Sequence, residues 1–142
     1  MAGEVVAPAI TIFPEDSLYR GIHPMYYQQG QLLSGVFCLN KKHKIEDGPS
    51  VGIAKLIVLK SFHSLIAVDW GVGEFLASAP LSLSLAVHCL PDSAWGEFAN
   101  AHAVITDYQK LTDKDRGNAQ RALRDALQKN IVIKPQERTT GQ

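Results

Sequence analysis

Cysteine and excess charge are both scarce in this chain. Its two cysteines, Cys38 and Cys89, do not form a C-x-x-C pair, which excludes a zinc ribbon and a thioredoxin-type motif. The 14 lysines and arginines are balanced by 14 aspartates and glutamates, so the formal net charge is zero. Because general binding to nucleic acid or to an anionic membrane needs clustered positive charge, we expect neither as a partner.

A long uninterrupted apolar segment is also missing. The longest apolar-rich stretch, residues 51–72, contains Lys55, Lys60 and Asp69, whose charges make a membrane span costly. The first 13 residues carry Glu4 and no basic residue, whereas a signal peptide begins with a positively charged segment. We therefore predict a soluble, cytoplasmic protein.

Sequence motifs for metals and nucleotides are absent too. The five histidines are never four positions apart and no H-E-x-x-H motif occurs, so we predict no metal site. The pair Gly71 and Gly73 is followed by Leu76, where a dinucleotide-binding fingerprint needs its third glycine. We interpret these glycines as a bulge or a turn.

The composition is that of one globular domain. Apolar residues make up 46% of the 142 residues and charged residues 20%, values that permit a sizeable core. We predict a single domain over residues 1–142, with 1–13 as a possible arm and 136–142 as a flexible tail.

Alternating apolar and polar residues predict strands along much of the chain. This period of two indicates side chains that point in turn to the two faces of a sheet, and it is clearest at residues 81–88. Residues 51–66 fit either a helix or strands, and 69–77 either extend a strand or begin a helical turn. The predicted strands are residues 18–22, 32–39, 50–53, 65–68, 81–88, 101–106 and 131–133.

One helix is predicted, over residues 113–129. Thr112 is a suitable N-cap, and Asp113 and Asp115 suit the positive end of the helix dipole. Strands without regular β–α alternation, followed by this helix, predict an α+β fold: a twisted, mainly antiparallel sheet with the C-terminal helix packed on one face. The apolar stripe expected to face the sheet is Ala119, Ala122, Leu123, Ala126 and Leu127.

Ser50 lies in a sequence that matches a catalytic motif by its letters. Residues 48–52 read Gly-Pro-Ser-Val-Gly, the G-x-S-x-G of a nucleophile elbow. That elbow needs a strand before the serine and a helix after it. Residues 44–47 are too charged for a central strand, so we interpret the motif as a turn.

Arg20 is the strongest lead to a bound ligand. It lies on a predicted strand between apolar residues, and a charge in that position needs a partner. The partner is either a group of its own fold or a bound anion, because a guanidinium pairs with phosphate or carboxylate through two hydrogen bonds.

The Leu-Tyr-Arg-Gly strand at 18–21 and the Ser-Gly-Val-Phe segment at 34–37 resemble the opening of ADP-ribosyltransferase-like and RES-type folds. The resemblance implies NAD as a cofactor. Carried over by position, it implies Arg20 as the contact to the NAD phosphates, Ser34 or Ser50 as the serine, and Glu74 as the acid that orients the ribose.

A second resemblance covers more of the chain. Leu-Tyr-Arg at 18–20, Asp-Gly-Pro-Ser-Val at 47–51, Ala-His-Ala-Val at 101–104 and the terminal helix are similar to a set of small uncharacterised bacterial single-domain proteins. It implies one compact domain that accompanies larger partners. The candidate ligand-binding residues are Arg20, His23, Ser50 and His102. His102 lies between two alanines, which suits a core position, a position at the rim of a pocket, or a base. His23 suits a turn.

Two functions follow from these observations. The first is a non-enzymatic binding or accessory domain without a cofactor, which acts through a protein partner in a bacterial multi-component system. Exposed aromatic residues at 26–27 and 95–98 are the expected anchors of that interface. The alternative is an NAD-using transferase or glycohydrolase, which requires Arg20, a serine and Glu74 to line one cleft.

Overall fold

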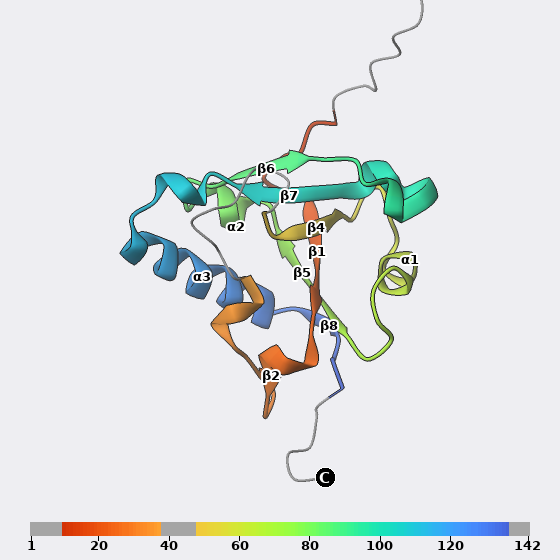
Figure 1. Cartoon of the computed structure of the whole chain (residues 1–142), viewed down its shortest axis with the longest axis horizontal. Coiled ribbons are helices and arrows are strands. Elements are labelled where there is room, and N and C mark those ends of the chain that lie inside the picture. Colours follow the sequence, from red (N-terminus) through yellow and green to blue (C-terminus); the bar gives the residue numbers. More distant parts are fainter. Residues whose placement is uncertain (1–9, 38–47, 137–142) are drawn as a thin grey trace, which may run out of the picture.

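A six-stranded antiparallel sheet forms the centre of the protein (Figure 1). The computed structural model describes residues 10–37 and 48–136. The strand order is β6-β7-β4-β1-β5-β8. The strands of this sheet are β1 (Ser17–Ile22), β4 (Ser50–Ile53), β5 (Gly71–Leu76), β6 (Ala86–Cys89), β7 (His102–Thr106) and β8 (Ile131–Ile133).

Helices and a small hairpin surround this sheet. The hairpin consists of β2 (Tyr27–Gln28) and β3 (Gln31–Leu32). The α-helices are α1 (Leu59–Ser64), α2 (Ser78–Leu81) and α3 (Asp113–Gln128). The 3₁₀ segments are η1 (Pro24–Tyr26), η2 (Ser34–Phe37), η4 (Ser93–Ala101) and η5 (Tyr108–Lys110).

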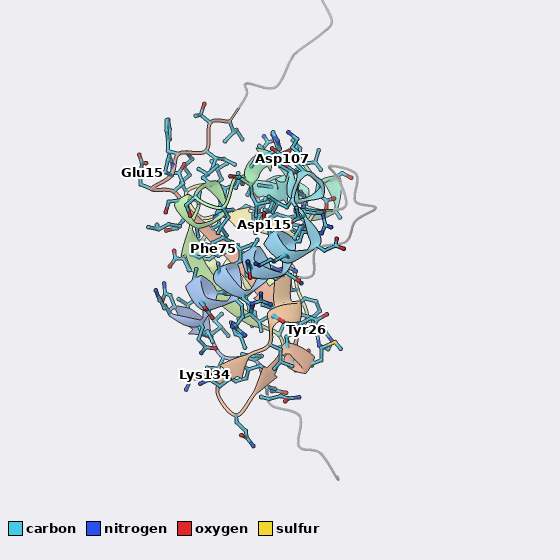
Figure 2. The ribbon with its side chains drawn as sticks, turned by 90° about the vertical axis from the view of Figure 1, so that its left-hand side faces the viewer. Glu15, Tyr26, Phe75, Asp107, Asp115 and Lys134 are labelled. Carbon is cyan, nitrogen blue, oxygen red and sulfur yellow. The ribbon has the colours of Figure 1, made fainter. Side chains whose placement is uncertain are left out.

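The predicted α+β class, with an antiparallel sheet and a C-terminal helix on it, is confirmed. Every strand pair in the large sheet is antiparallel. Figure 1 shows α3 and α1 on opposite sides of β1 and β5, and Figure 2, viewed from the side of α3, shows this helix lying across the sheet. Thr112 caps α3 as predicted, because its hydroxyl accepts a hydrogen bond from the Asp115 N–H at 3.1 Å.

The two faces of the sheet carry different residues. Adjacent residues of a strand point to opposite faces, so Leu18, Arg20 and Ile22 of β1 face one way and Tyr19 faces the other. The first face forms the main core with α3 and η2. The second face carries a smaller apolar cluster that contains Tyr19 and Phe62 of α1.

Glycine lets the helices approach both faces closely. A Cβ at Gly73 of β5 would lie 2.3 Å from the Leu127 side chain of α3. A Cβ at Gly52 of β4 would lie 2.7 Å from the Phe62 ring of α1. Real Cβ atoms do not come so close to other atoms, so α3 and α1 can pack against the sheet at these positions only because glycine has no Cβ.

The prediction of a strand at 81–88 was wrong for most of its length. α2 ends at Leu81, the chain then turns through Ser84 at φ 63°, and β6 begins only at Ala86. Leu85 is buried but Leu81 is exposed. The alternating leucines and serines therefore belong to a helix end and a turn, which the period of two did not distinguish from a strand.

Two other predicted strands are replaced by turns and helices. In the predicted strand 32–39, β3 ends at Leu32 and residues 34–37 form η2. The turn is possible because Gly35 leaves room for the Tyr26 ring, while residues 38 and 39 lie outside the described residues. The predicted strand 65–68 follows α1 as a turn. The ambiguous stretch 51–66 therefore contains both a strand end and a helix.

Within residues 10–37 and 48–136, no helix has both the length and the apolar character needed to cross a membrane.

Candidate functional site

Ser50 and His102, both singled out in the sequence, meet on the second face of the sheet. Ser50 begins β4 and is exposed, whereas His102 begins β7 and is only 6% exposed. The register places His102 opposite Gly52, and Ser50 opposite Val104. The two side chains are thus diagonal neighbours across adjacent strands, and Ser50 Oγ lies 3.0 Å from His102 Nε2.

The other ring nitrogen of His102 determines which way this hydrogen bond points. His102 Nδ1 lies 2.6 Å from the Leu90 carbonyl oxygen. A carbonyl oxygen only accepts, so Nδ1 carries the proton in this contact. In the neutral ring, Nε2 then has a free electron pair and accepts the hydrogen bond that the Ser50 hydroxyl donates.

Aromatic rings support His102 from the side. The Trp95 ring of η4 meets it edge to face, with centroids 4.8 Å apart and an interplanar angle of 81°. Trp95 in turn contacts Phe62 of α1, which contacts Tyr19 of β1. This row of rings connects α1 and η4 to the sheet and restricts the orientation of the imidazole.

Arg20 lies on the other face of the sheet and is bound by its own fold. Its Nε and Nη2 donate to the Val36 carbonyl at 3.2 and 2.9 Å, and its Nη1 donates to the Ser50 carbonyl at 2.8 Å. The guanidinium also lies 5.5 Å from the centroid of the Phe37 ring. Arg20 therefore joins η2 to the first residue of β4, and through that residue it helps to hold the backbone of Ser50.

The residues that the NAD hypothesis requires do not line one cleft. Arg20 pairs with Gly73 of β5, whereas Glu74 pairs with Tyr19, so their side chains point to opposite faces. Ser34 begins η2, the segment whose Val36 carbonyl accepts hydrogen bonds from Arg20. Ser50 Oγ is on the opposite face with His102. These positions do not fit a dinucleotide held between Arg20 and Glu74.

His23 has a local structural role in the turn after β1. Its Nδ1 accepts a hydrogen bond from the Met25 N–H at 3.0 Å, which caps η1. Its ring lies 5.0 Å from the Trp70 ring, edge to face. His23 is therefore not brought together with Ser50 and His102.

The aromatic residues expected to anchor a partner pack largely within the fold. Tyr27 is buried and Tyr26 packs against the main core. Trp95 and Phe98 pack against the smaller cluster on the second face. Tyr26, Trp95 and Phe98 are only partly exposed, so less of their area is available to a partner than the sequence predicted.

The described part of the chain brings no three histidine, cysteine, aspartate or glutamate side chains together in a metal-binding group. Cys89 is a free thiol whose Sγ donates to the Asn100 carbonyl, and burial raises its pKa. Cys38 lies outside the described residues.

The pairing of Ser50 with His102 is what the sequence did not reveal. The G-x-S-x-G letters were present, but no nucleophile elbow forms, because Ser50 begins a strand and no helix follows it directly. The partner lies 52 positions further along the chain. Only the β4–β7 register brings the two side chains together.

Comparison of this chain with protein-family models, with curated proteins and with solved structures finds no match.

Proposed function

We propose that this protein acts through Ser50 as an activated nucleophile that attacks the acyl carbon of an ester. The observation that carries the proposal is the array from Ser50 Oγ to His102 Nε2, and from His102 Nδ1 to the Leu90 carbonyl, at 3.0 and 2.6 Å. A serine within hydrogen-bond reach of a base that a third group orients is the arrangement of nucleophilic catalysis. Here a backbone carbonyl takes the orienting role.

The chemistry follows from the protons. As Ser50 Oγ forms a bond to the acyl carbon, its proton moves to His102 Nε2, and the Leu90 carbonyl stabilises the imidazolium through Nδ1–H. The ester C–O bond then breaks, and the alcohol leaves with the proton from Nε2. Water then attacks the acyl carbon of the acyl-serine and passes a proton to His102 Nε2. The bond between the acyl carbon and Ser50 Oγ breaks, the carboxylic acid leaves, and Nε2 returns the proton to Ser50 Oγ.

The location of the two groups favours this role. Ser50 is exposed and can meet a substrate, whereas His102 is buried between the sheet and the Trp95 ring. Burial limits competition by water for Nε2, and the ring contact keeps the imidazole aligned. We further propose that the protein acts in the cytoplasm, as its sequence predicts.

A fluorophosphonate probe tests the proposal. Its phosphorus bonds to an activated serine oxygen and fluoride leaves, which adds a fixed mass to the protein. We expect the wild-type chain to be labelled once, at Ser50, and Ser50→Ala to abolish the label. Ser82→Ala is the matched control, since Ser82 is exposed and its hydroxyl donates to the Ala79 carbonyl rather than to a histidine. Intact-mass and peptide-mass spectrometry give the readout; an unlabelled wild-type protein contradicts the proposal.

A second candidate function, binding of a protein partner, is favoured by exposed apolar side chains on both flanks of α1. Val58 immediately precedes this helix and is 66% exposed, and Val68 follows it and is 85% exposed. Leu56 is also exposed. Exposed aliphatic side chains gain free energy when a partner covers them.

Co-purification tests this second candidate. The chain is mixed with the products of its co-expressed neighbouring genes and run on a sizing column. We expect a complex that the double variant Val58→Ser/Val68→Ser weakens by about tenfold, a loss of about 1.4 kcal/mol. Elution of the wild-type chain without any of these proteins counts against it.

A further inference from the structure

An open cavity of about 350 Å³ lies beside the C-terminal half of β5, next to the residues that pair with β8. β8 pairs with Val72 and Gly73, and the Glu74 N–H donates to the carbonyl of Asn130 just before β8, so Phe75 and Leu76 extend beyond this pairing. The last turn of α3 and the start of α2 form the other walls. None of the residues assigned to the Ser50 site lines this cavity.

The cavity combines an apolar surface with one acidic and one basic side chain. Phe75, Leu76 and Ala126 supply apolar surface, and Glu74 and Lys129 supply the charges. Among the described residues, no ion pair joins Glu74 to Lys129.

The contact between the Glu74 carboxylate and Asn130 is weak. The Asn130 amide donates to its Oε1 at 3.4 Å, a long hydrogen bond. Burial, and secondly the negative charge of Glu74, raise the pKa of the neighbouring Tyr19 hydroxyl. Glu74 itself lines the cavity.

We propose that this cavity binds a small zwitterion, a free α-amino acid with an aliphatic side chain. Glu74 receives its ammonium group, Lys129 receives its carboxylate, and the apolar surface of Phe75, Leu76 and Ala126 covers its side chain. Separate acidic and basic groups beside an apolar surface match the three parts of such a molecule. A ligand with a single charge leaves one of the two protein charges without a partner.

Titration of the ¹⁵N-labelled protein with L-leucine tests this proposal. We expect saturable chemical-shift changes at the amides of Phe75, Leu76 and Ala79. Glu74→Gln and Lys129→Gln each weaken binding by about tenfold, the loss of one charge-assisted hydrogen bond. The matched control is Glu97→Gln, which removes an exposed acid on η4, outside the cavity.

Two analogues of leucine separate the roles of the charges. Isopentylamine lacks the carboxylate, so its binding depends on Glu74 and not on Lys129; 4-methylpentanoate lacks the ammonium and shows the opposite dependence. The proposal is overturned if leucine gives no saturable shifts, if the shifts fall at other residues, or if both charge variants bind leucine as tightly as the wild-type protein does. Labelling of Ser50 is unaffected by Glu74→Gln, so failure here is distinguishable from failure of the proposed function.

Discussion

Replacing His102 with glutamine is expected to slow fluorophosphonate labelling of Ser50 by at least about 100-fold, the usual contribution of a general base. A glutamine amide can still donate a hydrogen bond to the Leu90 carbonyl, and its oxygen can accept one from Ser50. It does not take up the serine proton at neutral pH. The variant therefore removes the base and retains hydrogen-bonding groups at that position. The rate of mass gain during labelling is the measurement.

His88→Gln is the control for this variant. His88 is exposed on β6 and pairs with Val104 of β7, the strand that separates it from Ser50 on β4. We expect its labelling rate to equal that of the wild-type protein. Thermal unfolding of both variants shows whether the fold is intact. If the His102→Gln protein is folded and is labelled at the wild-type rate, the hydrogen bond between Ser50 and His102 is structural and does not activate the serine.

Replacing Arg20 with methionine is expected to lower the free energy of unfolding by about 2–4 kcal/mol. Three hydrogen bonds from the charged guanidinium to the Val36 and Ser50 carbonyls are lost, and these acceptors have no equivalent donor in a methionine. Arg20→Lys is expected to recover less than half of the loss, because one ammonium does not reproduce the planar fork that bridges both carbonyls. Urea unfolding measures the difference.

Arg124→Met provides the comparison for Arg20. Arg124 lies on α3, and its Nε donates to the carboxylate of its neighbour Asp125. Pairs of this kind near the surface contribute at most about 1 kcal/mol. If Arg20→Met is no less stable than Arg124→Met, the carbonyl contacts of Arg20 do not stabilise the fold, and a bound anion becomes the better explanation of this residue.

The parts of the fold that could be predicted from sequence are those with local signals. The Thr112 cap and the apolar stripe of α3 are encoded within a few turns of one helix, and they predicted its position correctly. The short strands at 18–22, 50–53 and 131–133 were also predicted, because proline and glycine mark their ends. The prediction of a strand over residues 81–88 was wrong for most of its length. The same alternation of leucine and serine also occurs in a helix end and a turn, where Leu85 is buried and Leu81 is exposed.

The amino-acid sequence by itself determined the α+β class, the C-terminal helix and the candidates Arg20, Ser50 and His102. It did not determine which of them act together. Arg20 and Ser50 lie 30 positions apart, and Ser50 and His102 lie 52 apart. The pairing of β4 with β7 decided that Ser50 faces His102, and the alternation along β1 and β5 decided that Arg20 and Glu74 face opposite ways. Strand register is set by packing between distant segments, so only the tertiary structure could decide these contacts.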